Sequence, residues 1–393
     1  MNDKEKILYV SSNLFPLNSG AAIYSYGNID RFSEYFTLDL VSFVQEIPSG
    51  EFYDALTQKI NKFSWFLFEP KTIDFLWYSL KNRVIFQKYS KKMVQEINSL
   101  IEKNSYRYLF FDGLLTFYLL NEVQKKKDEK IILIEHNVEY LNIQEEIAYA
   151  PSFGDRIYKS LLGIGLKGFE KRSLLRSDFV LFISDHDKRN AEVLVGEKIR
   201  GFVLPPFFPF PRIKFEKELL QTNFSLLILG TMWWYPNVYG ALWFINHVFP
   251  YIQAYEPRYR LFIVGKDPSK ELRRHKSEAV IITGSVPSID EYIKNCDFLI
   301  VPNNLGGGIK IKIFEGIMKG IPVLARPESI LGYPAGLFPE EYLANDPEAF
   351  ARMVIQQNQN PELKIKFIEQ GQNKLKNYSD LSGLIKNLDE SFF

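Results

Sequence analysis

The most informative segment of the chain reads Val301-Pro-Asn-Asn-Leu-Gly-Gly-Gly-Ile-Lys-Ile-Lys-Ile-Phe-Glu-Gly316. Its first residue ends an apolar run, Phe298 to Val301, of the kind that forms a strand buried on both faces of a parallel sheet. Three consecutive glycines then let the backbone approach a ligand closely, and the helical pattern after them leaves free N–H groups in its first turn. A strand, a glycine-rich turn and a helix in this order indicate an α/β unit with an anion site at the helix N-terminus.

Charged side chains in this segment indicate what the anion is. Lys310 and Lys312 put two positive charges at the start of the predicted helix, where the helix dipole favours negative charge, so both are costly without an anion. Glu315, about one turn beyond Lys312, could accept hydrogen bonds from two hydroxyls of a sugar ring such as ribose. These features predict a site for a nucleoside diphosphate. Its residues are Gly306, Gly307, Gly308, Lys310, Lys312 and Glu315.

The same segment also has a plain structural interpretation. Lysines solvated on a glycine-rich turn, with Glu315 paired to Lys312 or Lys319 along the helix, would have the same sequence. No Gly-Lys-Ser or Gly-Lys-Thr follows a first glycine at the required spacing, which excludes a Walker-type phosphate loop.

Apolar runs alternate with helical patterns over the whole chain. Strands are expected at 7–11, 38–43, 108–111, 131–135 and 179–184, and again at 225–230, 260–265, 280–283, 298–301 and 322–325. Such alternation predicts right-handed crossovers and a parallel sheet covered on both faces in each half. Four prolines in Leu204 to Pro211 exclude a helix interior or a central strand there, so this segment is interpreted as an interdomain linker. Two Rossmann-like halves would face each other across a ligand-binding cleft.

Composition excludes several classes of protein. The 393 residues are 46% hydrophobic, which excludes disorder, and 48 basic against 47 acidic residues argue against a general nucleic-acid binder. One cysteine, Cys296, cannot form an internal disulfide, and the four histidines show no zinc-type spacing. The N-terminus lacks the long apolar region of a signal peptide, and residues 108–120 fall short of the ~20 residues of a membrane span. A cytoplasmic protein is expected.

Further segments occur in a fixed order along the chain. In the first half these are Ile7 to Gly20, Glu135-His-Asn-Val-Glu139, and Phe169 to Asp178 with Ile183-Ser184. In the second half they are Leu229 to Val238, Ile263-Val-Gly265, Thr283 to Pro287 and the triple glycine. By their order and spacing they resemble the family-4 retaining glycosyltransferases of the GT-B fold, also called glycosyl transferases group 1, over nearly the whole length.

The resemblance implies a GT-B fold with three parts. Residues 1–205 would form an N-terminal Rossmann-like acceptor-side domain, and residues 206–370 a C-terminal Rossmann-like nucleotide-sugar-binding domain. Residues 371–393 would form a C-terminal helix that crosses back to pack on the N-terminal domain.

The resemblance also implies an activity. A hexosyltransferase-type enzyme would move a sugar, with retention of configuration, from a UDP- or GDP-sugar to a glycan, lipid-linked or protein acceptor in cell-surface polysaccharide or glycoconjugate biosynthesis. No cofactor, metal or nucleic acid is expected. Physical reasoning supports the absence of a metal, because Lys310, Lys312 and the helix N-terminus can stabilise the leaving diphosphate.

The resemblance assigns roles to individual residues. His136, just after the strand at 131–135, matches a histidine that contacts the donor sugar near the reacting carbon, although a packed or capping histidine is the alternative. His136, Lys312 and Glu315 are therefore the predicted catalytic residues. Gly20 would approach the diphosphate from the first domain. The other predicted donor-binding residues are Gly230 and Thr231 beside the phosphates, and Gly284 and Val286 beside the base.

Three acidic features follow predicted strands of the first half. Asp112 and Glu139 could orient the acceptor hydroxyl or simply be solvated loop residues. Asp185-His-Asp187 mimics the metal-binding Asp-x-Asp of a different glycosyltransferase fold, and its position after an N-terminal strand favours a surface loop.

One departure from the family keeps other functions open. Many members carry two glutamates separated by seven residues, and Gly307 stands where the first would lie, with Glu315 as the second. A catalytically silent GT-B partner protein and a nucleotide-sugar epimerase are therefore the alternatives. Residues 81–92 and 156–176 mix basic and apolar side chains, which indicates either peripheral contact with the inner face of a membrane or amphipathic helices with a solvated face.

Overall fold

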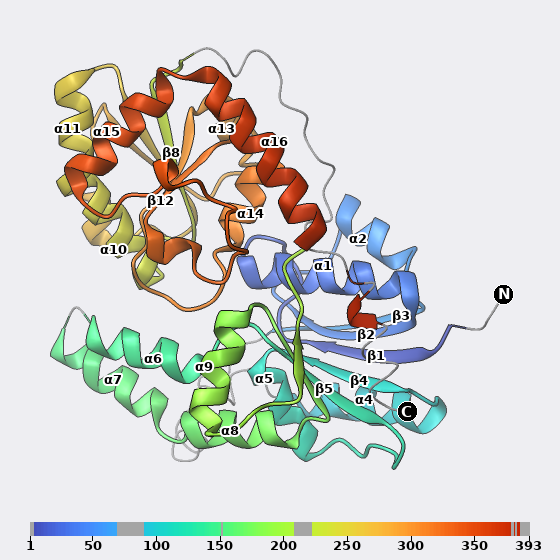
Figure 1. Cartoon of the computed structure of the whole chain (residues 1–393). Helices are drawn as coiled ribbons and strands as arrows, with labels where there is room; N and C mark the ends of the chain where they lie inside the picture. Colours follow the sequence, from blue (N-terminus) through green and yellow to red (C-terminus); the bar gives the residue numbers. More distant parts are fainter. Residues whose placement is uncertain are drawn as a thin grey trace. The chain divides into compact units, whose positions relative to one another are not determined.

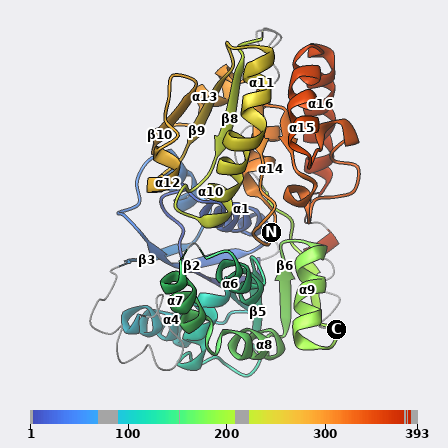
Figure 2. The same ribbon diagram turned by 90° about the vertical axis from the view of Figure 1, so that its left-hand side faces the viewer.

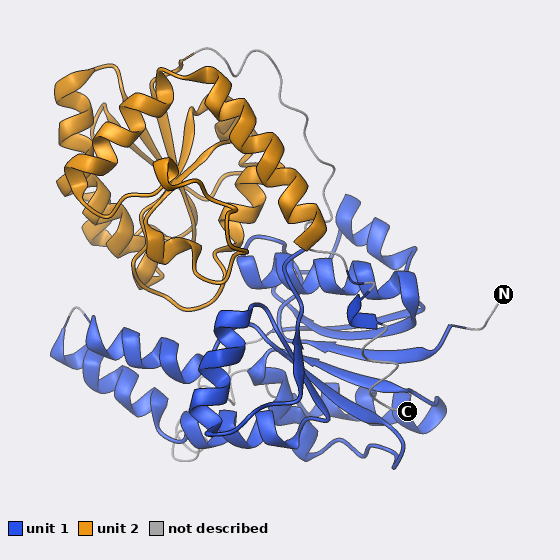
Figure 3. Cartoon of the chain, in the orientation of Figure 1, with its two compact units in different colours: residues 1–209, 381–393 blue, residues 210–380 orange. Residues whose placement is uncertain are grey.

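The chain divides into two compact units (Figure 3). The computed structural model describes residues 4–68, 90–150, 152–207, 222–378, 381 and 383–385. Unit 1 comprises Met1–Pro209 with Leu381–Phe393, and unit 2 comprises Phe210–Asp380. The helix expected from residue 371 is the second half of α16 (Pro361–Tyr378), which lies in unit 2. The expected boundary at residue 370 was therefore misplaced, because the helical pattern runs through it without a stop signal.

Unit 1 is built on a seven-stranded sheet with the order β3-β2-β1-β4-β5-β6-β7, and all its strand pairs are parallel. The strands are β1 (Lys6–Ser11), β2 (Thr37–Val44), β3 (Lys62–Leu67), β4 (Tyr108–Asp112), β5 (Lys130–Glu135), β6 (Phe179–Phe182) and β7 (Gly201–Val203). The five predicted strands are confirmed. The sequence analysis missed β3 and β7, which both lie at sheet edges and are mostly half-buried.

Helices cover both faces of this sheet (Figure 1). Ser19 caps α1 (Gly20–Tyr35) by accepting a 3.3 Å hydrogen bond from the Ala22 N–H, and Phe32 of α1 packs on Phe110 of β4. Met93 and other residues of α4 (Lys91–Lys103) fill the opposite face, since successive strand residues point to opposite sides. The remaining helices are α2 (Glu51–Thr57), α5 (Leu114–Phe117), α6 (Glu139–Ala148), α7 (Phe153–Gly163), α8 (Leu166–Arg176) and α9 (Asp185–Val195).

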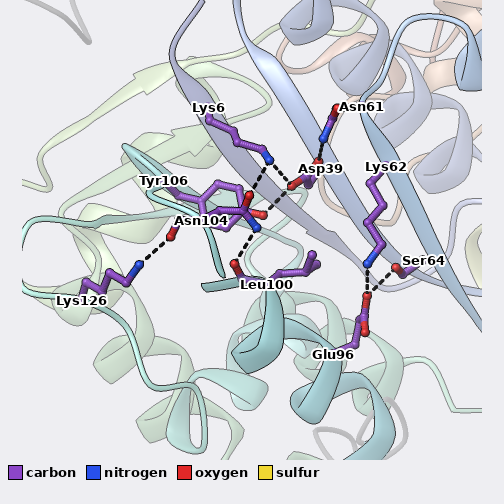
Figure 4. Close-up of polar contacts among 10 residues, drawn as sticks. All are labelled: Lys6, Asp39, Asn61, Lys62, Ser64, Glu96, Leu100, Asn104, Tyr106 and Lys126. Carbon is purple, nitrogen blue, oxygen red and sulfur yellow. Dashed lines mark hydrogen bonds and ion pairs between the residues drawn. The ribbon is translucent and has the colours of Figure 1, made fainter. Parts of the chain in front are cut away.

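A polar network joins the strands of unit 1 near their amino ends (Figure 4). Asp39 is 1% exposed and accepts hydrogen bonds from Asn61 Nδ2 at 2.6 Å and Tyr106 Oη at 2.5 Å, and it pairs with Lys6 Nζ at 3.0 Å. Burial raises the pKa of Tyr106, and the Asp39 carboxylate raises it further, so the phenol stays protonated and donates. This network fixes the sheet at the ends opposite to the carboxyl edge, where ligands of such folds bind.

Unit 2 has a five-stranded parallel sheet with the order β10-β9-β8-β11-β12, a doubly wound arrangement. Its strands are β8 (Ser225–Leu229), β9 (Arg260–Val264), β10 (Val280–Gly284), β11 (Phe298–Val301) and β12 (Val323–Ala325). Its α-helices are α10 (Tyr235–Trp243), α11 (Phe249–Tyr255), α12 (Lys270–Arg273), α13 (Asp290–Asn295), α14 (Ile311–Met318), α15 (Pro347–Asn358) and α16. All five predicted strands are confirmed, so each half has the expected Rossmann-like fold.

Close packing fixes the helix that follows the glycine-rich segment. A Cβ on Gly316 of α14 would lie 2.6 Å from the Leu299 side chain of β11, so only glycine permits this approach. Gln372 Nε2 of α16 donates 3.1 Å hydrogen bonds to the carbonyls of Ile317 and Met318, at the C-terminal end of α14. Helix α14 therefore packs against β11 and is hydrogen-bonded to α16 at its C-terminal end.

Candidate functional site

The glycine-rich loop joins β11 to α14 in unit 2. Gly306 and Gly308 have φ values of +85° and +70°, which L side chains rarely adopt. A Cβ on Gly306 would also lie 2.9 Å from the Trp234 side chain, so this tryptophan packs on the loop. The indole of the neighbouring Trp233 is exposed. The loop conformation therefore needs glycine at two of its three glycine positions.

Lys310 turns back onto this loop. Its buried ammonium donates to the carbonyls of Gly307 at 3.1 Å and Gly308 at 3.2 Å, and also to that of Gly306. Lys310 is the N-cap residue of α14, one position earlier than the predicted first turn. Its charge thus lies at the helix N-terminus, where it also holds the three glycine carbonyls together.

The first turn of α14 retains donors for an anion. The Phe314 N–H donates to Tyr333 Oη at 3.1 Å, and this hydroxyl donates in turn to the Lys310 carbonyl at 3.0 Å. Within the described part of the chain, the N–H groups of Ile311 and Lys312 have no hydrogen-bond partner. Unpaired N–H groups and the positive end of the helix dipole make this terminus suitable for a phosphate group.

Lys312 is the most unusual charge in unit 2. Its Nζ donates a 2.7 Å hydrogen bond to Asn237 Oδ1, and no carboxylate among the described residues pairs with it. Burial, together with the nearby charge of Lys310, lowers the pKa of Lys312 to about 7. A buried ammonium without a counter-ion is costly, so this position favours a bound anion.

Asn237 connects Lys312 to the end of β8. Its Nδ2 donates to the Thr231 carbonyl at 3.1 Å, while its Oδ1 also accepts from Asn303 Nδ2 at 3.2 Å. A Cβ on Gly230, whose φ is +153°, would lie 2.5 Å from Asn237 Nδ2. Asn237 therefore connects Gly230 and Thr231 to Asn303 and Lys312.

Gly284 lies at the same edge of the sheet. The Gly230 N–H donates to the Val264 carbonyl at 3.2 Å, and the Gly265 N–H donates to the Gly284 carbonyl at 3.1 Å. Gly284 itself has φ +75° and ends β10, and Val286 follows it half-buried in the loop before α13. Gly265, directly after the end of β9, therefore lies between Gly284 and the turn at Gly230.

Glu315 is held within its own helix. Its Oε1 lies 3.1 Å from Lys319 Nζ, and Lys319 Nζ lies 2.8 Å from Asp290 Oδ1. Burial raises the pKa of Glu315 despite the opposing charge of Lys319. The ion pair with Lys319 is the plain structural alternative stated above for Glu315.

His136 and Gly20 belong to unit 1. His136 Nε2 lies 2.5 Å from Asp112 Oδ1, and the His136 ring meets Tyr24 edge to face at 4.9 Å between centroids. Burial disfavours the imidazolium, but the Asp112 carboxylate outweighs this effect and raises the pKa of His136. Gly20 is the first residue of α1, as expected for a residue at a helix N-terminus.

The carboxyl groups of Glu135, Glu139 and Glu170 lie near His136. Glu170 Oε1 and Oε2 accept the N–H groups of Glu139 at 2.6 Å and Tyr140 at 2.9 Å and so cap α6. Burial raises the pKa values of Glu139 and Glu170, and it raises that of Glu135 with a further contribution from the charge of Glu170. Glu139 is thus a helix-start residue rather than a solvated loop residue.

The segment Asp185-His-Asp187 is not a surface loop, which corrects the interpretation from sequence. It forms the first turn of α9, where Ser184 Oγ accepts the Asp187 N–H at 3.1 Å and also bonds the Asp187 carboxylate. Asp187 is buried. Two aspartates in the first turn complement the helix dipole, so this segment has a capping role.

The sequence analysis assigned no role to three residues that contact site residues: Asn237 and Asn303 in unit 2, and Tyr24 in unit 1. Asn237 was quoted within the segment Leu229 to Val238 but received no role. Its signal is Pro236 at the start of α10, which places Asn237 in the first turn after β8. For Asn303 and Tyr24, no local pattern separates an ordinary polar or aromatic residue from one that contacts a site residue.

Comparisons with known proteins agree with this geometry. Residues 223–360 match the family model described as Glycosyl transferases group 1. An uncharacterized 44.6 kDa protein in the cps region of Klebsiella pneumoniae is 22% identical over 371 residues, which cover 90% of this chain and 91% of that protein. Unit 2 thus carries a Glycosyl transferases group 1 domain, which includes the glycine-rich loop, Asn237 and Lys312.

Solved structures share the fold of the whole chain. HepE of Anabaena, in complex with UDP and glucose, superposes with a TM-score of 0.65 at 14% identity and covers 99% of both chains. Sucrose-phosphate synthase of Thermosynechococcus elongatus has a TM-score of 0.63 at 12% identity, covering 99% of this chain and 98% of that one. The fold is that of the GT-B glycosyltransferases. In the described residues, none of the helices combines the length and hydropathy needed to span a membrane.

Proposed function

We propose that this chain is a cytoplasmic, family-4 retaining glycosyltransferase that transfers a sugar, of the hexosyl type, from a UDP- or GDP-sugar to a glycan, glycolipid or glycoprotein acceptor. The observation that carries the proposal is the ammonium of the half-buried Lys312, which lacks a carboxylate partner among the described residues and lies beside unpaired N–H groups at the start of α14. A diphosphate supplies the negative charge that this position lacks. The Glycosyl transferases group 1 match over the same residues supports this ligand class.

The chemistry proposed for unit 2 is leaving-group stabilisation. As the bond from the sugar to the diphosphate breaks, negative charge grows on the diphosphate, and fixed donors at Lys312 and the α14 terminus stabilise that charge. Because Asn237 and the close approach of Gly230 hold Lys312 in place, little reorganisation is needed during the reaction. In other enzymes a metal ion stabilises the charge of a leaving diphosphate. Lys312 and the N-terminus of α14 can do the same, so we propose a metal-independent reaction.

The remaining site residues would hold the sugar, ribose and base. Glu315 would accept hydroxyl hydrogen bonds after exchanging its contact with Lys319. Gly284 and Val286 would hold the base through their main chain. His136, oriented by Asp112, would contact the transferred sugar, and Gly20 at the start of α1 would add N–H groups toward the diphosphate.

The relatives suggest a donor and a pathway. HepE was crystallised with UDP-glucose, and a TarM of S. aureus with UDP, so a UDP-sugar is the first donor to test. The relative from Klebsiella pneumoniae is described as lying in a cps region, which supports a role in cell-surface polysaccharide or glycoconjugate biosynthesis.

The test is release of nucleoside diphosphate from a panel of UDP-, GDP-, ADP- and dTDP-sugars without added metal. Wild type should release the nucleotide slowly from one donor, and Lys312→Met should lose this release. Lys276→Met, at an exposed lysine of the same unit, is the matched control and should keep it. If nucleotide release and nucleotide binding are both undetectable across the panel, the proposal is wrong.

A catalytically silent partner protein is the second candidate, and specific contacts favour it. Lys310 is bonded to its own loop and Glu315 to Lys319, while Gly307 replaces the first glutamate of many relatives. A partner protein would keep its binding function in Lys312→Met and would release no nucleotide. A nucleotide-sugar epimerase would instead yield an isomeric nucleotide sugar, which product analysis distinguishes directly.

A further inference from the structure

The helix α7 of unit 1 carries an apolar surface that the proposed sugar transfer does not use. It runs beside α6 (Figures 1 and 2). All its residues, Phe153–Gly163, are described, and none of them is buried. A helix in a globular domain normally buries one apolar face against its own core. The apolar residues of α7 therefore need an explanation outside that core.

One side of α7 faces α6. Lys159 Nζ lies 3.0 Å from Glu146 Oε2, and a Cβ on Gly163 would lie 3.6 Å from the Ile143 side chain. Leu162 packs against the small core cluster that contains Ile143. These contacts define the face of α7 that the α6 neighbour covers.

The other side of α7 presents an exposed apolar row. Phe153, Ile157 and Leu161 recur every four residues, and Ile164 follows directly after the helix, so the four side chains lie on one face. At 100° per residue, Lys159 and Leu162 fall on the opposite face. Phe153 is 78% exposed and Ile164 is 62% exposed. We call Phe153, Ile157, Leu161 and Ile164 the α7 stripe.

Basic residues are concentrated on α7 and on α8, which contacts it. Residues 152–176 contain six basic and two acidic residues, although the whole chain has a net charge of only +1. Both acids are engaged near helix starts, since Asp155 accepts from Ser152 Oγ at 2.6 Å and Glu170 caps α6. The exposed basic residues are Arg156, Lys167, Lys171, Arg172 and Arg176. An apolar helical face next to basic side chains fits the interface of an anionic bilayer.

We propose that the α7 stripe inserts into the interface of an anionic lipid bilayer and seats unit 1 on that surface. A second copy of the chain would bring these five exposed basic residues against the same five, whereas anionic headgroups neutralise them. The sequence-based expectation covered residues 156–176; the stripe takes Ile157, Leu161 and Ile164 from that range and adds Phe153, which precedes it. Most of the other expected segment, 81–92, lies outside the described residues. The proposal does not depend on the sugar transfer.

The experiment is co-sedimentation of the full chain with phosphatidylcholine vesicles, with and without phosphatidylglycerol. Wild type should bind the vesicles that contain phosphatidylglycerol, and high salt should weaken binding. The variant Phe153→Ser/Ile157→Ser/Leu161→Ser should bind them roughly tenfold less tightly or worse. Arg156→Gln should weaken binding by a smaller factor, because it removes charge and leaves the stripe intact.

A matched control removes exposed apolar groups elsewhere. Ile47→Ser/Val193→Ser/Tyr251→Ser alters three residues that are also more than half exposed, and it should bind as wild type does. Equal thermal unfolding of all variants shows that the fold is kept. Two outcomes overturn the proposal: the stripe variant binds as tightly as wild type, or wild type stays in the supernatant. A dimer that disappears in the stripe variant, without lipid binding, would assign the stripe to a second copy.

Discussion

Lys312 allows the candidate site to be tested without any substrate. Burial lowers its pKa to about 7 from the ordinary lysine value of 10.5. Between these two values the unfolded chain binds more protons at this residue than the folded chain does. The free energy of unfolding must therefore rise with pH over this range, because the buried charge that opposes folding is lost.

Linkage between the two pKa values sets the size of the effect. From about pH 7 to about pH 9, wild type should gain about 2 kcal/mol of stability from this residue. Lys312→Met removes the titrating group, so the stability of wild type relative to the variant should increase by that amount over the same interval. A saturating nucleoside diphosphate should reduce the pH dependence, since a bound anion restores the ordinary charge of the lysine.

Urea unfolding followed by tryptophan fluorescence measures this difference. Three of the five tryptophans, Trp233, Trp234 and Trp243, belong to unit 2, so the signal includes the unit that contains Lys312, and the difference between wild type and Lys312→Met isolates the effect of this residue. Lys319→Met is the control on the neighbouring turn: burial opposes its charge, but Glu315 raises the pKa of Lys319 overall, so no change is expected over this range. If the difference in free energy of unfolding between wild type and Lys312→Met is the same at about pH 7 and about pH 9, the folded protein does not hold Lys312 as an ammonium without a counter-ion.

Four further outcomes are expected. Asp39→Ala should lower the stability of unit 1 by about 3 kcal/mol in urea unfolding, because three donors lose a buried carboxylate, and should leave nucleotide affinity unchanged. Gly230→Ala should cost about 1–3 kcal/mol and weaken nucleotide binding in calorimetry, since its Cβ would displace Asn237; unchanged affinity would contradict the proposed role of that contact. Asp112→Asn should lower the pKa of His136 in an NMR titration, and an unchanged titration would show that Asp112 does not hold the imidazolium. Glu135→Gln should stabilise unit 1 at neutral pH by about 1 kcal/mol, measured by thermal unfolding, because burial, and then the charge of Glu170, disfavours the ionised carboxylate that the unfolded chain carries, whereas the amide is neutral in both states.

The interior strands of both sheets could be predicted from the sequence. A strand buried on both faces needs a continuous apolar run, as in Phe298 to Val301, and no solvated segment imitates that run for long. Edge strands lack this requirement, so Lys62–Leu67, with its half-buried residues, escaped prediction. Asp185 to Asp187 was misread because only Ile183 and Ser184 separate the end of β6 from α9, so these aspartates already belong to the helix.

The glycine-rich loop was predictable because its conformation depends on residue type. Positive φ values at Gly306 and Gly308 require residues without a Cβ, so the local sequence had to contain glycine there. Lys312 was likewise identified from its position at a helix start, where a positive charge is locally unfavourable. These are short-range constraints, and a single chain segment expresses them fully.

The partners of these residues depend on contacts between distant segments. That Lys310 bonds its own loop, that Lys312 bonds Asn237 seventy-five residues away, and that Glu315 bonds Lys319 rather than Lys312 follow from how β8, β11 and α14 are packed. The exposure of the α7 stripe is of the same kind, because an amphipathic pattern predicts an apolar face without showing whether the protein itself covers it. Local sequence thus determined the strands, the glycine loop and the candidate charges, since backbone sterics and hydrophobic periodicity act over a few residues. Tertiary packing decided the burial and the pairing of each charge, because both depend on side chains from other strands and helices.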